Sequence, residues 1–263
     1  MQNDDMKTVD LCVPNGGGLA TIKRLMKSIN LVNGVEFKHI IIADQGDCGG
    51  GEWLKSAEKE IPNLFVIFNS DNIPPPSPYN DCLDLSRSFG ELSEYIHFLD
   101  DDMEILDGTY LKQMMEFYET NDIALMSTEQ CYFGPRPIPQ NGIVPDFGMG
   151  AFLFKRNIFV QLGFLDERYS FHCSDSDLCT RVKLILKKKI AILPGSMTML
   201  RHYHQLGTRK AFKGFHQETI NRDWVIYKEK WDNKDNLKLE FQERLTKIDR
   251  KQYWSEKCKN ATI

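Results

Sequence analysis

The sequence contains no long apolar run. Although 41% of its 263 residues are hydrophobic, no stretch reaches the about 20 consecutive apolar residues of a membrane-spanning helix. Residues 1–7 are polar and do not resemble the apolar core of a secretory signal. We therefore expect a cytoplasmic protein, and a peripheral contact with the inner face of a membrane stays open.

An excess of charge of one sign is also missing. The 33 basic and 37 acidic residues leave a formal net charge of −4, which argues against a nucleic-acid partner, because such partners bind basic surfaces. The seven cysteines include no Cys-x-x-Cys pair of the kind that binds zinc, so we expect reduced thiols. The composition is that of an ordinary globular protein, and a homo-oligomer stays open.

Two glycine motifs are absent after the first expected strand. Gly16, Gly17 and Gly18 do not form Gly-x-Gly-x-x-Gly, the dinucleotide-binding fingerprint. Residues 15–18 also contain no Lys or Arg, whereas a nucleotidyltransferase needs a basic glycine-rich loop for its triphosphate. The sequence therefore argues against a nucleotidyltransferase that forms sugar nucleotides, although this class of enzyme stays open.

What the sequence does contain is an alternation of apolar runs and amphipathic segments. In the first hundred residues, short apolar runs predict strands at 9–14, 39–43, 64–68 and 95–99. Segments with helical spacing lie between these runs. This order predicts an α/β fold, a mostly parallel sheet flanked by helices.

The second half of the sequence is less regular. Four prolines within 72–80 predict an extended loop that lines the site, followed by a short helix at 83–89. A proline-rich loop is expected at 131–145. Further strands are expected at 123–127, 147–154, 190–193 and 197–200, and further helices at 155–162, 178–186 and 220–231. Residues after 233 are expected to form a charged helical tail.

Three consecutive carboxylates, Asp100, Asp101 and Asp102, directly follow the expected strand at 95–99. In an open α/β sheet, ligands bind at the carboxyl ends of the strands. Because side chains alternate along an extended segment, Asp100 and Asp102 would point to one side, and clustered oxygen ligands suit Mg²⁺ or Mn²⁺. The alternative is an acidic turn that caps the next helix.

A second acidic pair, Asp175 and Asp177, precedes an expected helix. Ser174 and Asp177 have the spacing of a capping box in its acidic form, and Arg181, four residues on, is placed to pair with Asp177. This leaves Asp175 just outside the helix, beside the aromatic segment 169–171. A carboxylate near apolar walls and a second acid has a raised pKa, as a general base needs.

Two histidines, His202 and His204, follow the strand expected at 197–200. They are two residues apart, so both side chains would point the same way on an extended segment. A structural role and a role as metal ligands are both compatible with this pattern.

In order and spacing, these motifs resemble the family-2 glycosyltransferases, which have the GT-A fold. The resemblance extends over nearly the whole chain and rests on Pro14-Asn15, 41–46, Tyr79-Asn80, 98–102, 148–156, 163–168, 175–181 and 221–231. This chain departs from the family in having Ser174 in place of the acid that usually precedes the base. It also has Tyr79 in place of an arginine, and prolines at 74–78.

The resemblance implies a role for each matching position. It implies that the donor is held by Pro14, Asn15, Asp44, Asn80, Asp100 and Asp101. It implies a divalent metal, Mn²⁺ or Mg²⁺, held by Asp102 with help from Asp100 and from His202 or His204. It implies that Asp175 is the catalytic base and that 148–156 and 163–168 shape the acceptor side.

The expected molecule is a single GT-A domain with a C-terminal helical extension. Residues 1–105 would form its nucleotide-sugar-binding half, 106–215 its acceptor-binding and catalytic half, and 216–263 the extension. The expected reaction is transfer of a sugar, with inversion, from a nucleoside diphosphate sugar to a hydroxyl of a glycan or another acceptor. The family's habit favours a UDP-linked donor. Besides the nucleotidyltransferase, a non-catalytic carbohydrate-binding module on the same fold is an alternative.

Overall fold

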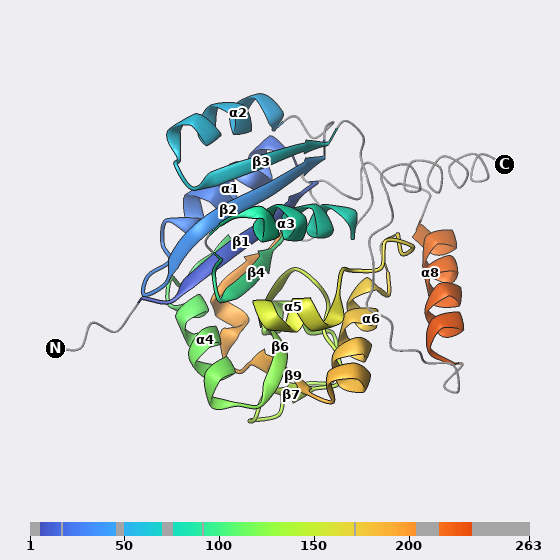
Figure 1. The fold of residues 1–263 in the computed structure, drawn as a ribbon. Coiled ribbons are helices and arrows are strands. Elements are labelled where there is room, and N and C mark those ends of the chain that lie inside the picture. Colours follow the sequence, from blue (N-terminus) through green and yellow to red (C-terminus); the bar gives the residue numbers. More distant parts are fainter. Residues whose placement is uncertain are drawn as a thin grey trace.

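The computed structural model describes residues 6–16, 18–45, 50–69, 76–90, 92–170, 172–203 and 216–232. In this part of the chain, eight strands form one sheet in the order β3-β2-β1-β4-β8-β6-β9-β7, and helices cover both of its faces (Figure 1). The predicted α/β class is confirmed.

The first half of the sheet is parallel. It contains β1 (Thr8–Asn15), β2 (Glu36–Gln45), β3 (Leu64–Asn69) and β4 (Tyr95–Leu99). The connecting helices are α1 (Leu19–Ile29), α2 (Gly51–Glu60) and α3 (Ser77–Ser88). All four strands predicted in this half are confirmed, and because they run in one direction, their carboxyl ends lie at one edge of the sheet.

The second half of the sheet is mixed. β8 (Ala151–Lys155) runs antiparallel to both of its neighbours, β4 and β6 (Ile123–Thr128). β9 (Lys189–Leu193) is parallel to β6, and β7 (Ile143–Val144) is antiparallel to β9. β5 (Met103–Ile105) and β10 (Leu200–His202) form a separate antiparallel pair. β8 therefore joins the two halves of the chain in a single sheet.

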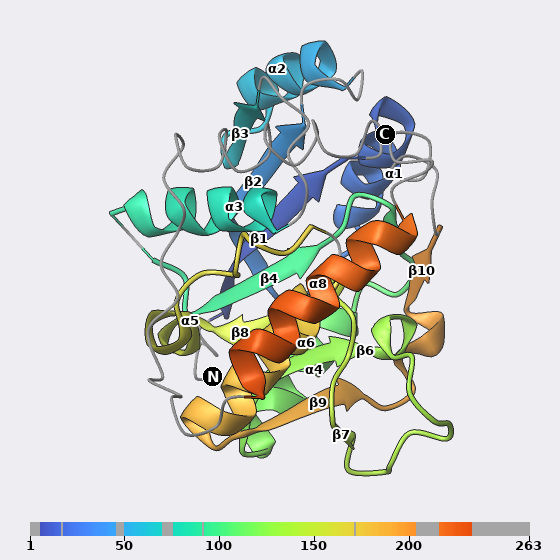
Figure 2. The same cartoon turned by 90° about the vertical axis from the view of Figure 1, so that its right-hand side faces the viewer.

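The remaining helices are α4 (Tyr110–Thr120), α5 (Arg156–Leu162), α6 (Ser174–Arg181) and α8 (His216–Trp231). Leu25 of α1 and Leu111 of α4 are buried in one apolar core, and Leu83 of α3 and Leu178 of α6 in a second core on the other face of the sheet. Burial of one such leucine stabilises the fold by about 1.5–3 kcal/mol. Figure 2 shows α8 crossing the outer side of α6.

One element differs from its prediction close to the expected site. α3 begins at Ser77, so Pro78, Tyr79 and Asn80 lie in a helix and not in an extended loop. A proline is tolerated in the first turn of a helix, because the N–H groups there have no partner within the helix. Residues 72–75 of the predicted loop lie outside the described residues.

Three boundaries in the second half also differ. The segment predicted as a strand at 197–200 forms a 3₁₀ turn, Ser196–Thr198, before β10 begins. The strand predicted at 147–154 begins only at Ala151, after Gly150, whose φ of 149° lies in a region that favours glycine. The predicted loop at 131–145 contains the short strand β7.

The C-terminal extension is described only in part. α8 confirms the helix predicted at 220–231, and the predicted tail after 233 lies outside the described residues. Among the helices of the described residues, none has the length and apolar character that crossing a bilayer requires.

Candidate active site

Asn15 and Asp44 lie side by side at the carboxyl ends of β1 and β2, where the parallel register pairs them. The Asn15 Nδ2 donates a hydrogen bond to Asp44 Oδ1 over 2.6 Å, and both side chains are buried. Burial raises the pKa of Asp44, although the hydrogen bond from Asn15 opposes this shift. The two residues form a polar pair at the strand ends, as the sequence predicts for the donor site.

One atom of this pair has no hydrogen-bond partner among the residues that the structure describes. Asn15 Oδ1 is buried and accepts no hydrogen bond from the described residues, although buried polar atoms in folded proteins are almost always paired. Gly50 and Gly51, where α2 begins, lie close: a Cβ built on Gly51 would be 3.5 Å from Asp44 Oδ2. Pro14 is buried in β1 opposite Ala43, and its expected contact with the donor stays a prediction. An N–H donor of a ligand would satisfy Asn15 Oδ1.

The three consecutive acids differ in their environments. Asp101 is buried and accepts a 2.8 Å hydrogen bond from the Thr21 hydroxyl in α1. Asp100 accepts a hydrogen bond from the Tyr79 hydroxyl in α3, and its own N–H donates to the carbonyl of Gly150 over 2.7 Å. Asp101 is thus tied to α1. Asp101 and Asp102 lie in a turn, which the Met103 N–H closes by donating to the Asp100 carbonyl over 3.0 Å, and not in the extended segment that the predicted alternation assumes. Asp102 is nevertheless close enough for its charge to act on Asp100.

The pKa of Asp100 is raised because the side chain is buried and lies near a second carboxylate. Burial and the negative charge of Asp102 raise the pKa of Asp100 to about 7, and the hydrogen bond from Tyr79 opposes this rise. Burial and Asp100 together raise the pKa of Tyr79 well above its ordinary value, so Tyr79 stays a protonated donor. A cation placed between Asp100 and Asp102 would relieve the repulsion between them.

His202 in β10 faces Asp102. Its Nε2 lies 3.2 Å from Asp102 Oδ1, and the N–H of Tyr203 donates to the carbonyl of Asp102 over 3.0 Å. Burial lowers the pKa of His202, but the Asp102 and Asp100 carboxylates outweigh this effect and raise it overall. The pairing of β5 with β10 therefore brings a predicted histidine to the predicted acids, and His204 lies outside the described residues.

The donor types of this cluster fit Mn²⁺ or Mg²⁺, which accept carboxylate oxygens and, for Mn²⁺, imidazole. No group of three His, Cys, Asp or Glu side chains within the described residues is arranged to hold a metal ion by itself. Such ions are commonly held by one or two carboxylates together with the phosphates of a substrate. The cluster fits an ion that binds together with a phosphorylated ligand.

Asp175 lies in the first turn of α6 and not before the helix. Its side chain is half-buried, and burial raises its pKa. The backbone amides of Ser176 and Met149 favour the ionised form, whereas the charge of Asp146 opposes it. The environment is one that a general base needs, because the pKa lies above that of an ordinary aspartate.

The predicted capping box is wrong. α6 begins at Ser174, preceded by Cys173 in the left-handed region with φ of 65°, and the Cys173 side chain makes no capping hydrogen bond. The Asp177 N–H donates to the Cys173 carbonyl over 2.7 Å, while the Ser174 hydroxyl contacts the Met149 sulfur at 3.7 Å. The Asp177 carboxylate therefore does not cap the helix and binds other side chains.

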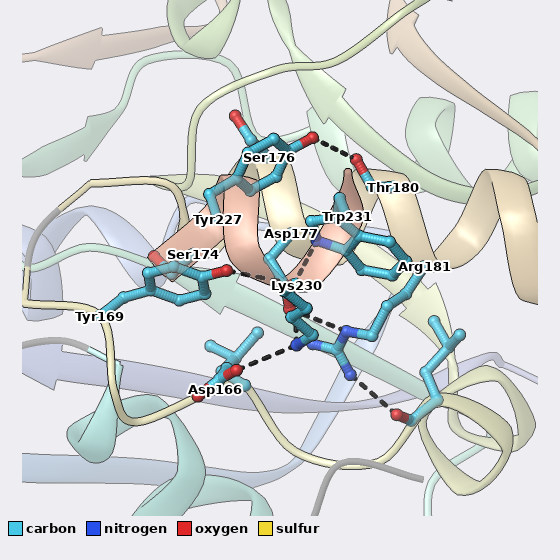
Figure 3. Close-up of polar contacts among 12 residues, drawn as sticks. Asp166, Tyr169, Ser174, Ser176, Asp177, Thr180, Arg181, Tyr227, Lys230 and Trp231 are labelled. Carbon is cyan, nitrogen blue, oxygen red and sulfur yellow. Dashed lines mark hydrogen bonds and ion pairs between the residues drawn. The ribbon is translucent and has the colours of Figure 1, made fainter. Parts of the chain in front are cut away.

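Asp177 is fully buried, and Figure 3 shows its polar partners. Its Oδ2 lies 3.0 Å from the Arg181 Nε, which confirms the predicted pair. Lys230 Nζ and Trp231 Nε1, both in α8, lie 2.8 and 2.9 Å from its Oδ1. Four cationic or polar neighbours, including Tyr169 at 3.4 Å, give Asp177 a structural role.

Asn80 in α3 forms hydrogen bonds with the second half of the chain. It is fully buried, and its Nδ2 donates to the Leu165 carbonyl and to Glu167 Oε1, both over 2.9 Å. Its Oδ1 accepts the N–H of Leu165 over 2.9 Å. Asn80 thus ties α3 to the turn after α5, and its predicted contact with the donor stays a prediction.

The segment 148–150 links the two acidic clusters. The Gly150 carbonyl accepts the N–H of Asp100, and the backbone amide of Met149 acts on the Asp175 carboxylate. The resemblance did indicate this segment, as part of the acceptor side, but the roles of Tyr79 and Lys230 were missed. Tyr79 could have been found from its place in the motif before Asn80. Lys230 lies 53 positions after Asp177, and nothing in the local sequence links them.

The comparisons with known proteins find similarity in structure alone. No protein-family model and no curated protein sequence matches the chain. Three similar solved structures are the mannosyltransferase PcManGT from Pyrobaculum calidifontis in complex with GDP-Man and Mn²⁺, S. aureus TarS 1–349, and GalNAc-T7 with UDP, GalNAc and Mn²⁺.

These similarities are distant. The TM-scores are 0.57, 0.52 and 0.57, at sequence identities of 14%, 19% and 13%. The matches cover 71%, 72% and 73% of this chain but only 55%, 58% and 43% of the other chains, so the chain spans about half the length of the proteins it resembles. At these identities the comparison establishes the fold: the chain has the GT-A fold, as the resemblance implied.

Proposed function

We propose that this chain is a glycosyltransferase that moves a sugar from a nucleoside diphosphate sugar to an acceptor hydroxyl. One observation carries the proposal. The segment 148–150 is linked to two kinds of carboxylate. The Gly150 carbonyl accepts the N–H of Asp100, which repels Asp102 beside His202, and the Met149 amide acts on the half-buried Asp175. A cation-binding pair and a separate base are the two parts that this reaction needs.

The nucleoside would lie against Asn15 and Asp44. A uracil N3–H could donate to the Asp44 carboxylate, and Asn15 Oδ1 is a buried acceptor that lacks a partner within the described residues. Guanine could donate through N1–H and N2–H₂ to the same atoms. Of the structurally similar proteins, GalNAc-T7 was solved with UDP and the mannosyltransferase with GDP-Man. We favour UDP and keep GDP as the second donor class.

Asp100, Asp102 and His202 would hold Mn²⁺ or Mg²⁺ together with the diphosphate of the donor, and His204 stays a candidate as well. A bound divalent cation would stabilise the negative charge that grows on the leaving diphosphate. Tyr79 donates to Asp100 and fixes the direction of that carboxylate. Thr21 donates to Asp101 in the same manner, and the expected contact of Asp101 with the donor stays a prediction.

Asp175 would act as the general base. It takes the proton of the acceptor hydroxyl while the acceptor oxygen forms a bond to the anomeric carbon of the donor. The bond from that carbon to the phosphate oxygen breaks, and the nucleoside diphosphate leaves with the electron pair. Attack from the face opposite the leaving group inverts the configuration of the sugar, and the acceptor would be a glycan or another molecule with a free hydroxyl.

The test is a hydrolysis and transfer panel. The purified chain is incubated with UDP-glucose, UDP-GalNAc, GDP-mannose and dTDP-glucose, with Mn²⁺, with Mg²⁺ or with excess EDTA. We expect release of nucleoside diphosphate from one donor class, which stops in EDTA and returns with Mn²⁺. Release of pyrophosphate from a sugar phosphate and a nucleoside triphosphate would favour the nucleotidyltransferase instead. Binding of a glycan without turnover of any donor would favour the carbohydrate-binding module.

A further inference from the structure

Hydrogen bonds and ion pairs at three positions along α8 join this helix to the second half of the chain. The Asp223 carboxylate accepts the N–H groups of Ser170 and His172 over 2.8 and 2.9 Å. One turn later, the hydroxyls of Tyr227 and Thr180 lie 2.8 Å apart. These contacts join α8 to α6 and to the segment that precedes it, and Figures 1 and 2 show α8 lying beside α6.

The third level is the buried carboxylate of Asp177. The Trp231 Nε1–H donates to Asp177 Oδ1 over 2.9 Å, and Lys230 Nζ lies 2.8 Å from the same atom and 2.9 Å from Asp166 Oδ2. Arg181 occupies the other oxygen of Asp177 (Figure 3). A charge buried to this degree costs several kcal/mol unless its partners stay in place, so the end of α8 and the first turn of α6 are strongly coupled.

The first turn of α6 needs such support. Cys173, just before it, has a φ of 65°, a left-handed conformation that is strained for a non-glycine residue and persists only when its surroundings enforce it. The Cys173 side chain makes no capping hydrogen bond at the start of the helix. Asp175 stands in this turn, two residues before Asp177. Contacts that hold Asp177 in place therefore also hold the backbone of this turn, which carries the Asp175 side chain.

We propose that α8 holds the first turn of α6, with Trp231 and Lys230 as positioning residues that set the direction of the Asp175 carboxylate. The role of Asp175 as base rests on the proposed function, whereas the hold of α8 on α6 does not. Neither Trp231 nor Lys230 touches the reacting atoms. Both act through Asp177.

The first arm of the test measures the hold itself and needs no substrate. Trp231→Phe keeps an aromatic ring and removes the N–H that binds Asp177, while Lys230→Met keeps the stem and removes the charge. Trp224→Phe is the matched control, because Trp224 lies on the same helix and is 46% exposed. Amide hydrogen exchange of residues 174–178 should become about tenfold faster in Trp231→Phe and in Lys230→Met, and should stay unchanged in Trp224→Phe.

The second arm measures the consequence for catalysis with the donor that the panel identifies. Trp231→Phe should lower kcat at least about tenfold, because small displacements of a reacting group are costly, with the KM for the donor and the affinity for UDP or GDP with Mn²⁺ unchanged. In the Asp175→Asn background, the same substitution should change kcat by no more than about twofold. A double-mutant cycle of this kind separates positioning of Asp175 from general damage.

Three outcomes decide the inference. Unchanged exchange at 174–178 in both α8 variants overturns it, and so does an equal loss of kcat in the presence and absence of the Asp175 carboxylate. Faster local exchange with a loss of kcat that depends on Asp175 supports it. If the wild-type chain turns over no donor, the proposed function fails, and the exchange arm still decides whether α8 holds α6.

Discussion

Asp44 illustrates how a single carboxylate can be tested as a nucleobase contact. Its only hydrogen-bond partner within the described residues is Asn15, and its pKa is raised by burial. Asp44→Ala should weaken UDP or GDP binding by about 1–3 kcal/mol, the range for a lost buried polar partner. Isothermal titration in the presence of Mn²⁺ measures this. Asp84→Ala, on the exposed side of α3, is the control, and equal affinities in both variants would place the base elsewhere.

Asp175 and Asp177 should respond differently to substitution, because Asp177 is held in a buried pair with Arg181 and Asp175 is the proposed base. Asp175→Asn keeps the shape of the side chain and removes the proton acceptor, so kcat should fall about 10²–10⁴-fold, the usual contribution of a positioned base, while donor binding stays normal. Asp177→Asn weakens the buried pair with Arg181 and should mainly lower the Tm. Steady-state kinetics and calorimetry measure both. Near-normal transfer by Asp175→Asn, together with an inactive but folded Asp177→Asn, would reverse the assignment.

The pH profile of kcat gives an independent view of Asp175. A base works only when deprotonated, so the rate should rise with pH through the pKa of Asp175 and then level off. Because burial raises that pKa, the rise should lie above the pH of about 3.9 expected for an ordinary aspartate. Measuring kcat between pH 4 and 8 in Asp175→Asn should show a profile without this rise. An acid limb that survives unchanged in the variant would point to another group.

At the residue scale, the sequence predicted an ion pair whose two residues lie close together in the chain. Arg181 lies four positions from Asp177 on a helix, and the predicted pair is present. The capping box failed because Cys173, and not Ser174, stands before the helix. The contact between Trp231 and Asp177 joins residues 54 positions apart, and spacing alone carries no information on such a contact.

At the scale of elements, α8 and the turn after α5 are connected by one buried carboxylate. Burial alone would raise the pKa of Asp166, but its bonds to Arg168 and the charge of Lys230 outweigh this and hold that pKa well below its usual range. A carboxylate whose folded pKa is depressed stabilises the fold above its unfolded pKa. That contribution is lost as the pH falls from about 4 toward the folded pKa.

Asp166→Asn tests this coupling between elements. At pH 7 the variant should lose about 3 kcal/mol of the free energy of unfolding, because two cations lose a buried partner. Below pH 4 its stability should depend less on pH than that of the wild type. Urea unfolding at several pH values measures both effects. A wild-type stability that is constant from pH 6 to pH 3 would contradict the argument.

Elements were predictable wherever one periodicity dominated. The four strands of the first half read as short apolar runs, and each is present. α3 was misjudged because prolines were taken as helix breakers, although Pro78 stands in a first turn. The segment 197–200 was too short for a periodicity, and its 3₁₀ turn is fixed by tertiary contacts such as that of the Ser196 hydroxyl with the Glu129 N–H.

At the scale of the whole molecule, ligand binding should be visible as stability. A ligand at about 100 times its dissociation constant adds roughly 2.7 kcal/mol to the free energy of unfolding. UDP or GDP should therefore raise the Tm more with Mn²⁺ than with EDTA, and Asp102→Ala should abolish the difference. Differential scanning fluorimetry measures this. An equal shift with Mn²⁺ and with EDTA would show that nucleotide binding needs no cation.

The antiparallel strand β8 has a consequence for exchanging parts between proteins of this fold. By its place in the chain it belongs to the second half, yet all five of its residues pair with β4 of the first half. A chimera joined after residue 105 would import a foreign neighbour for β4, with a new register and new side chains against Phe98. A junction that keeps this pairing lies beyond Lys155, so a module built on the first half of the sheet has to carry 106–155 with it.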